Sequence, residues 1–357
     1  MAVCGAGVVC YNGRIRETGS VYMREYDIIT IGSVTRDVFL KSGDFHVVKN
    51  SDLPDGERSY ETGKAGCFML GTKLEVPEVA IASGGGGTNT AVGFARQGLK
   101  TACIARVGDD GTGREIAEEL KNEGVNPLFQ IDGERDTAYS TILVATDGER
   151  TILEYRGAND HFKSEETDWE NLKSEWVYID SLAGDAELLR RILEWAKGNG
   201  AKVAFNPGKR LINMGKGLWP LLADIDIFIA NEDEFARIVG ADRGQKKEPE
   251  VFEKMRGIVK GIVVMSKGPK GVEVADGENH YAAGIPDSPV VDRTGAGDSF
   301  GSGFVSGYIQ SGGDIKFAIQ LGTANATSVV RHFGSKKGLL KKGEWGDYPK
   351  VEVVARG

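Results

Sequence analysis

A short acidic and glycine-rich motif near the end of the chain combines an anion site with a carboxylate. The motif reads DRTGAGDSF over residues 292–300 and leads into a segment with helical periodicity. Small residues at a helix N-terminus leave backbone N–H groups bare, and the helix dipole adds positive potential there. The amides of Gly295, Ala296 and Gly297 therefore predict an anion hole. Asp298 can direct its carboxylate at the same spot, although a simple helix cap is an equally good reading of the isolated motif.

A second glycine cluster, residues 83–91 (SGGGGTNTA), also precedes a helix-like segment. Its spacing fails the GxGxxG fingerprint of dinucleotide-binding folds, because Asn89 and Thr90 stand where a third glycine is needed. Asp109, about 20 residues further on, lies in a turn and not at a strand end. The cluster therefore argues against a dinucleotide-binding oxidoreductase.

Apolar strand-like runs alternate with amphipathic segments along most of the chain. This alternation predicts an α/β fold with a mostly parallel central sheet and helices on both faces. In such a sheet, ligands bind at the carboxyl ends of the strands. The expected strands are 26–31, 101–107, 202–205, 225–230 and 262–265, and the expected helices are 88–97, 112–123, 185–197, 231–239, 250–259, 296–310 and 314–331.

Two stretches interrupt the alternation. Residues 38–82 are polar and glycine-rich with short β patterns, and residues 137–156 form two extended runs around Asp147-Gly148. We expect them to pair into a small β-sheet that serves as a lid, with a peripheral decoration as the other reading. Residues 1–22 have no continuous pattern and are interpreted as an N-terminal extension, which leaves 23–357 as one large domain.

Composition excludes several classes of protein. The chain has 357 residues, of which 40% are apolar and 27% charged, an ordinary globular composition. A formal net charge of −8 argues against nucleic acid as a partner, because phosphate neutralisation needs clustered Lys and Arg. Four cysteines without CxxC spacing indicate a reducing compartment, and we expect a cytoplasmic protein. No apolar run approaches the roughly 18 residues of a membrane span.

Together, the two motifs resemble the signatures of the ribokinase-like (PfkB-type) family of sugar and nucleoside kinases. The N-terminal signature is Gly84-Gly85-x-Gly87-x-Asn89-x-Ala91 followed by Gly98 and Gly108, and the C-terminal signature is Thr294-Gly295-Ala296-Gly297-Asp298. The resemblance extends from about Tyr26 to Leu340 and implies a three-layer fold with a small β-sheet lid. It departs at Arg293, where the family usually carries a small or β-branched residue.

The resemblance implies a role for each part of a phosphoryl-transfer site. Asp298 is similar to the base that accepts the hydroxyl proton, and Gly295, Ala296 and Gly297 resemble the anion hole. Fixed dipoles of this kind suit a loose transition state with charge on the equatorial oxygens. The motif at 231–234 resembles NxxE, in which Asn231 would contact ATP and Glu234 would hold Mg²⁺ through water. Without the family, a helix cap is the alternative reading of Asn231.

For the acceptor, residues 32–37 resemble the family's GxxxxD motif, in which Asp37 would accept hydrogen bonds from two hydroxyls. The implied contacts are Thr35, Asp37, Gly85, Gly86 and Asn89. Thr35 stands where ribokinase-like members carry Asn, and Gly86 replaces a Lys of ribokinase. Both departures argue against ribose as the acceptor.

On the nucleotide side, residues 266–271 resemble a TxGxxG loop that contacts ATP phosphates, which implies contacts at Ser266 and Gly268. Asn325 is expected beside the adenine. The resemblance also implies a monovalent cation such as K⁺ near the carbonyls of Asp292, Thr294 and Gly334. The pair Lys336-Lys337 is expected to be solvated, with help in ATP entry as the other reading.

These features predict an ATP- and Mg²⁺-dependent kinase that phosphorylates a hydroxyl of a sugar or related polyol. A nucleoside kinase of the adenosine type is the alternative within the family, and a non-catalytic relative that binds a sugar or nucleotide is the alternative outside it. Asp298 and the NxxE motif favour a kinase, because a pure binding protein needs no base. We also expect a homodimer through the apolar outer face of the lid, near residues 68–70.

Overall fold

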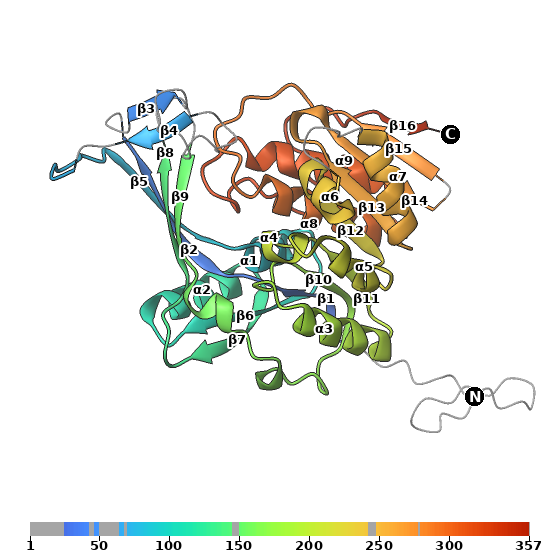
Figure 1. Ribbon diagram of the computed structural model, residues 1–357, viewed down its shortest axis with the longest axis horizontal. Helices are drawn as coiled ribbons and strands as arrows, with labels where there is room; N and C mark the ends of the chain where they lie inside the picture. The colour runs from blue at the N-terminus through green and yellow to red at the C-terminus, as the bar shows by residue number, and fades with distance from the viewer. Residues whose placement is uncertain are drawn as a thin grey trace, which may run out of the picture.

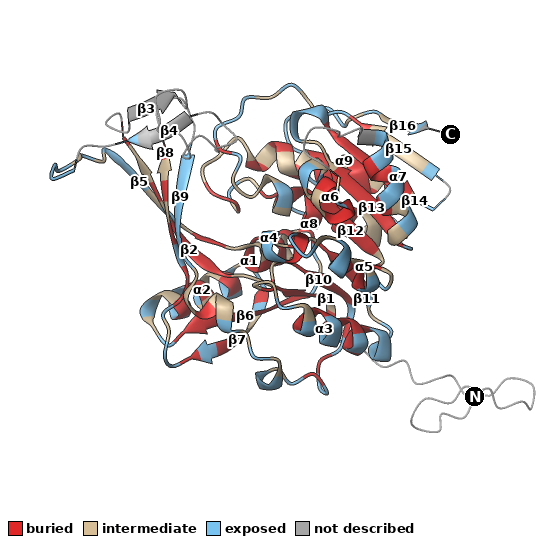
Figure 2. Ribbon diagram, viewed as in Figure 1, coloured by how far each residue is buried: buried red, intermediate tan, exposed pale blue. Residues whose placement is uncertain are grey.

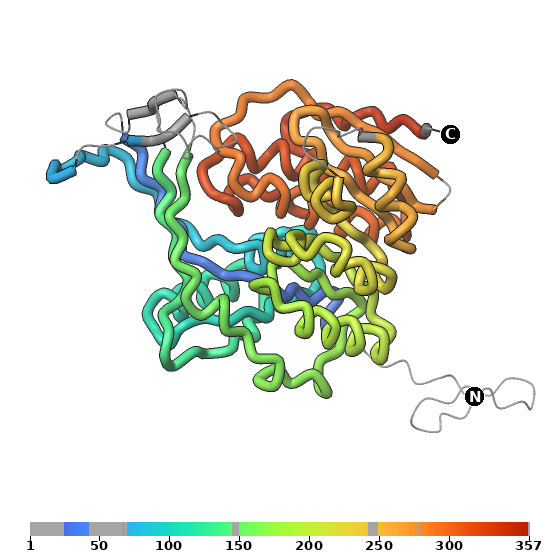
Figure 3. Tube along the Cα trace, viewed as in Figure 1, coloured from blue at the N-terminus to red at the C-terminus, as the bar shows by residue number. Residues whose placement is uncertain are grey.

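The computed structural model describes residues 25–42, 46–49, 64–67, 70–144, 150–241, 248–277 and 279–356. Figure 3 traces this chain from the blue N-terminal strands to the red C-terminal helices. The predicted extension, residues 1–22, lies outside the described residues.

The described residues form a ten-stranded central sheet in the order β16-β15-β14-β13-β12-β11-β10-β1-β6-β7 (Figure 1). Neighbouring strands from β7 to β13 are parallel, and β14, β15 and β16 continue the sheet antiparallel. The strands are β1 Tyr26–Ile31, β6 Thr101–Gly108, β7 Val125–Asp132, β10 Ser174–Ile179, β11 Lys202–Phe205, β12 Ile227–Asn231, β13 Ile262–Ser266, β14 Val272–Asp276, β15 Asn279–Ala283 and β16 Val353–Arg356.

Helices cover both faces of this sheet and complete three layers. One face packs against α3 to α7, and the other packs against α1, α2, α8 and α9. The inner strands are therefore buried on both sides, and β6 is buried along its whole length (Figure 2). The helices are α1 Gly86–Arg96, α2 Gly111–Asn122, α3 Ala186–Asn199, α4 Lys209–Ile212, α5 Trp219–Leu222, α6 Glu232–Val239, α7 Glu248–Ile258, α8 Ala296–Gln310 and α9 Ile315–Val329, with 3₁₀ turns η2 Gly157–His161, η3 Ser164–Glu166, η4 Gly215–Leu218 and η5 Gly268–Lys270.

The seven helices expected from the sequence are all present, and each end lies within two residues of its predicted position. Local capping explains this agreement. Asp185 caps α3 by accepting from the N–H groups of Glu187 and Leu188, and Gly200 ends the helix in the left-handed conformation. The predicted α/β fold with a mostly parallel sheet is confirmed.

A separate four-stranded sheet, called here the small sheet, stands at one side of the molecule (Figure 1). Its order is β5-β2-β8-β9, which brings the two interrupting stretches together as predicted. The strands are β2 Thr35–Lys41, β5 Glu78–Gly84, β8 Tyr139–Val144 and β9 Arg150–Tyr155, and a two-stranded sheet adds β3 His46–Lys49 and β4 Lys64–Cys67. Because β5 ends at Gly84 and α1 begins at Gly86, the small sheet is continuous with the glycine cluster.

The small sheet has two unlike faces. Phe39, Ile142 and Val144 pack together on the inner face. Ile81, Val38, Thr141 and Leu153 form a row across the four strands on the other face. On that face, Ile81 is 65% exposed and Leu153 is 56% exposed.

Candidate active site

The candidate site lies at the carboxyl edge of the central sheet, where several strands end together. Asp180 follows β10, and Asn231 and Ser266 end the adjacent strands β12 and β13, where they pair in register. The first loop after β1 carries Gly32 and Ser33. The parallel topology thus brings segments from both halves of the chain to one edge.

The N-terminus of α8 has the backbone shape expected of an anion site. Gly295 is the N-cap with φ of +73°, and a Cβ there would lie 2.3 Å from the Cβ of Ser335. Both observations require glycine. The Ala296 N–H donates to the Arg293 carbonyl at 3.3 Å, so this amide is shared with the preceding turn. Gly297 is exposed at the helix start.

Asp298 lies in the first turn of α8 and is tied to α1. Its Oδ2 accepts a hydrogen bond of 2.8 Å from Nδ2 of Asn89, whose Oδ1 accepts one of 2.7 Å from Ser335. Burial raises the pKa of Asp298, while the bond from Asn89 and the charge of Lys336 oppose that rise. Asn89 and Asp298, which were both predicted as site residues, are therefore in direct contact.

Asp37, predicted to bind the acceptor, is 8% exposed on β2. Thr35 donates to its Oδ1 over 2.6 Å, and a Cβ at Gly84 would lie 1.9 Å from its Oδ2. Burial raises the pKa of the Asp37 carboxyl. Thr35 thus orients Asp37, and glycine at position 84 makes room for the carboxylate.

A third carboxylate, Asp180, was not predicted from the sequence. It is 8% exposed after β10 and accepts a 3.3 Å hydrogen bond from the Ser33 hydroxyl. A Cβ at Gly86 would lie 2.2 Å from Asp180 Oδ2, so glycine at position 86, predicted as an acceptor contact, makes room for this carboxylate. Burial and the charge of Asp298 raise the pKa of Asp180 to about 7. The available sequence signal was an acidic residue directly after a buried strand.

Lys336 does not point into solvent, and its predicted solvation is wrong. Its Nζ donates to the Ser83 carbonyl at 2.6 Å, to the Ser83 hydroxyl at 2.9 Å and to Thr88 Oγ1 at 2.9 Å. Burial lowers the pKa of Lys336 to about 8. Electrostatic interactions with four acidic groups oppose this decrease, namely Asp37, Glu119, Cys103 and Asp298. Its neighbour Lys337 is exposed, as expected.

The NxxE residues form a reciprocal cap at the start of α6. Asn231 Oδ1 accepts from the Glu234 N–H at 3.0 Å, and Glu234 Oε2 accepts from the Asn231 N–H at 2.8 Å. Asn231 is therefore a helix cap, which was its alternative reading, and the box orients the Glu234 carboxylate toward the strand end. Burial raises the pKa of Glu234.

The loop after β13 depends on two glycines. Gly268 has φ of +54° and Gly271 has φ of +95°, and a Cβ at Gly271 would lie 1.9 Å from the Ala283 carbonyl oxygen. Lys267 in this loop pairs with Glu273 at 3.1 Å. Ser266 thus lies beside β12, paired with Asn231, and Gly268 follows in the loop.

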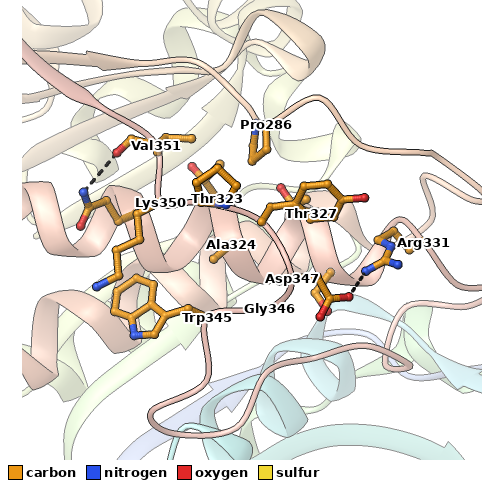
Figure 4. Close-up of a pocket in the computed structure, with 14 residues that line it drawn as sticks. Pro286, Thr323, Ala324, Thr327, Arg331, Trp345, Gly346, Asp347, Lys350 and Val351 are labelled. Atoms are coloured by element: carbon orange, nitrogen blue, oxygen red, sulfur yellow. Dashed lines mark hydrogen bonds and ion pairs between the residues drawn. The ribbon is translucent and has the colours of Figure 1, made fainter.

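Asn325 has a structural role that argues against the predicted adenine contact. It is 1% exposed, its Nδ2 donates to the Ser299 carbonyl at 2.7 Å, and its Oδ1 accepts from the Leu340 N–H at 2.9 Å. Both ends of the amide are thus used to join α9 to α8 and to the following loop. On the outer side of α9, Thr323, Ala324 and Thr327 line a pocket with residues 345–351 (Figure 4).

Comparison with known proteins supports the family. Residues 63–342 match the pfkB family carbohydrate kinases. An uncharacterized sugar kinase of Archaeoglobus fulgidus is 30% identical over 257 residues, covering 70% of this chain and 98% of the relative. A nucleoside kinase of Methanothermobacter thermautotrophicus is 28% identical over 291 residues, covering 78% of this chain and 91% of the relative.

A solved structure extends the comparison to the fold. A probable sugar kinase from Rhizobium etli superposes with a TM-score of 0.73 at 24% identity, covering 89% of this chain and 97% of that one. The chain belongs to the pfkB family of carbohydrate kinases. The predicted family, fold and enzyme class are confirmed. Among the described residues, none of the helices combines the length and apolar character needed to span a membrane.

Proposed function

We propose that this protein transfers the γ-phosphoryl group of ATP to a hydroxyl of a sugar or related polyol. The observation that carries the proposal is the position of Asp298 in the first turn of α8, hydrogen-bonded to Asn89. The carboxylate and the helix amides share one helix end, so a hydroxyl held there would meet both a base and an anion site.

The acceptor is proposed to lie among Asp37, Asp180 and Asn89. Carboxylates accept hydrogen bonds from hydroxyls, and the buried position of both aspartates makes such bonds strong. The negative charge of Asp298 raises the pKa of Asp180, and the negative charge of Asp37 raises the pKa of Asp298. This concentration of negative charge favours an uncharged polyol over a sugar phosphate.

During transfer, Asp298 would orient the acceptor hydroxyl and accept its proton. The positive charge of Lys336 acts on Asp37 and Asp298 and favours the ionised form of Asp298. The amides of Gly295 and Gly297, with that of Ala296 partly engaged by Arg293, would face the developing charge on the transferred group. The inner face of the small sheet, as a lid, would exclude water from the site.

The nucleotide is proposed to lie along the ends of β12 and β13, where Asn231, Ser266 and Gly268 would face its phosphates. Glu234 fits Mg²⁺ because its carboxylate is already oriented by the helix cap. Magnesium supplies charge neutralisation for the phosphates when bound. The Asp292 carboxylate pairs with Arg150, so K⁺ would depend on the backbone carbonyls of Asp292, Thr294 and Gly334.

A panel of sugars, sugar phosphates and nucleosides, assayed for ADP release with ATP and Mg²⁺, tests this function. We expect turnover with an uncharged polyol, and Asp298→Asn should remove it. Acceptor-dependent turnover that Asp298→Asn retains would refute the catalytic assignment. ATP or sugar binding without turnover on any acceptor would favour the non-catalytic alternative.

A nucleoside kinase is the second candidate. The similarity to the nucleoside kinase of Methanothermobacter thermautotrophicus spans most of both chains, as does that to the sugar kinase. Both acceptor types present adjacent hydroxyls to a carboxylate such as Asp37. The same panel separates them, because a nucleoside kinase would show a much higher kcat/KM with adenosine than with free pentoses.

We also propose a homodimer through the outer face of the small sheet. Val79, Ile81, Leu153 and Tyr155 are each at least half exposed there. Of the residues 68–70 predicted at this contact, Phe68 and Met69 lie outside the described residues, and Leu70 is exposed. An apolar face of this kind is stabilised when a second copy covers it.

A further inference from the structure

An ion pair joins the small sheet to the loop before α8. Arg150, the first residue of β9, donates through its guanidinium to Asp292 Oδ1 over 2.9 Å. The Asp292 side chain is 7% exposed, and that of Arg150 is 33% exposed. The pair therefore places a partly buried positive charge of the small sheet against a buried carboxylate in the loop before α8.

Asp292 organises the loop that leads to Gly295. Its Oδ1 also accepts from the Thr294 N–H at 2.9 Å and from the Thr294 hydroxyl at 2.7 Å. Its Oδ2 accepts from the Gly334 N–H at 3.2 Å. One carboxylate thus holds the loop ahead of α8 and the segment after α9.

The segment after α9 is itself packed against the proposed anion hole. Ser335 occupies the space that a Cβ at Gly295 would need, and it donates to Asn89. The small sheet approaches this segment at a second point, where Lys41 Nζ lies 5.5 Å from the ring centroid of Phe333. The small sheet therefore contacts both the loop ahead of α8, through Arg150, and the segment after α9, through Lys41.

We propose that Arg150 is a positioning residue for phosphoryl transfer, acting from the small sheet through Asp292 on the loop that presents the anion-hole amides. This inference rests on the proposed function of that loop. A buried carboxylate needs a charged partner or several donors. Without the guanidinium, Asp292 keeps only the uncharged donors of Thr294 and Gly334, and the loop is expected to shift toward solvent. A misplacement of about 1 Å at a reacting centre can cost ~10² in rate.

Arg150→Met tests the link, with Arg150→Gln as a second neutral variant and Arg150→Lys as the charge-preserving one. Arg190→Met is the matched control, because Arg190 pairs with Glu187 on the exposed surface of α3. The readouts are kcat and the KM of each substrate, the melting temperature, and amide hydrogen exchange of the peptide covering residues 292–300 without substrates.

We expect kcat to fall about 10- to 100-fold in both neutral variants, at nearly unchanged melting temperature and with small changes in KM for ATP. Exchange in the 292–300 peptide should speed up, and Arg150→Lys should recover most of both effects. The Arg190→Met control should match the wild type. If Arg150→Met does not fold, Arg150→Gln decides by the same criteria.

Wild-type exchange and wild-type kcat in the neutral variants would overturn the proposal. So would a loss of kcat that follows a fall in melting temperature and is not recovered by Lys, since that pattern indicates a stabilising role only. Faster exchange in a protein that transfers phosphoryl groups to no acceptor would keep the link between Arg150 and the loop and reject the proposed function.

Discussion

The side-chain amide of Asn89 donates a 2.8 Å hydrogen bond to Asp298 Oδ2, although the two residues are 209 positions apart. Asn89 lies on α1 and Asp298 on α8, and these helices pack on the same face of the central sheet. Ser335 donates to the other end of the amide, which leaves Nδ2 directed at the carboxylate. The orientation of the proposed base is thus set by the protein before any acceptor binds.

Asp298→Asn should lower kcat by about 10²–10⁴, the usual contribution of a general base. ATP affinity should change little, because the amide keeps the shape of the carboxylate and loses only its ability to take a proton. Steady-state kinetics on the identified acceptor, with ATP affinity from calorimetry, measures both quantities. A variant that kept wild-type kcat would show that another group accepts the proton.

Asp37→Ala should weaken acceptor binding far more than ATP binding. Loss of charge-assisted hydrogen bonds costs on the order of 1.5–3 kcal/mol, which corresponds to about one to two decades in acceptor KM. Thr35→Val is the matched comparison, because it removes only the hydroxyl that orients Asp37, and its effect should be smaller. Equal increases in the KM of both substrates would place Asp37 elsewhere in the mechanism.

The helices and the two glycine motifs were predictable from the sequence because their signals are local. Asp185 caps α3 and Gly200 ends it. Gly295 adopts a positive φ, which the glycine-rich motif before α8 indicates. The pairing of the two interrupting stretches was also predictable, since neither could bury a core alone. These features depend on short-range patterns that one sequence contains.

Asp180, Lys336 and Asn325 were missed or misassigned for one shared reason. Their roles depend on contacts between segments far apart in the chain, such as Lys336 with Ser83 and Thr88. A lysine pair in a polar segment looks solvated when its surroundings are unknown. Asn325 was expected beside the adenine, and a polar residue on a helix gives no sign of which side of the helix faces the core.

Asp180 should make both stability and acceptor binding depend on pH near neutrality. Its pKa is raised from 3.8 to about 7 in the folded protein, so the folded state binds more protons between these values. Stability should therefore fall as pH rises from about 4 to about 7, while acceptor KM should improve as the carboxylate ionises.

Asp180→Asn should flatten both dependences, because the amide does not titrate. Denaturant unfolding and acceptor KM between pH 5 and pH 8.5 provide the test, with Asp185→Asn as a control at an exposed helix cap. An unchanged pH profile of KM in Asp180→Asn would mean that Asp180 does not contact the acceptor.

Lys336→Met should move the acid limb of the kcat/KM profile to higher pH. The positive charge of Lys336 lowers the pKa of Asp298, so its removal lets burial raise that pKa further. Because Lys336 itself loses its proton at about pH 8, the wild type and the variant should converge above that pH. Lys337→Met, at the exposed neighbour, should retain the wild-type profile, and an unshifted limb in Lys336→Met would exclude this electrostatic role.

The outer face of the small sheet should hold two copies of the chain together. Ile81 and Leu153 belong to one row across the four strands, and both side chains are more than half exposed. Covering such a face removes apolar area from water at about 25 cal/mol per Å², so lysines in the centre of the contact should separate the copies. Light scattering at micromolar concentration should give twice the chain mass for the wild type and the single mass for Ile81→Lys combined with Leu153→Lys.

Ile131→Lys, an exposed apolar position on β7, is the control and should leave the mass unchanged. A fully active wild type of single-chain mass would rule out the dimer.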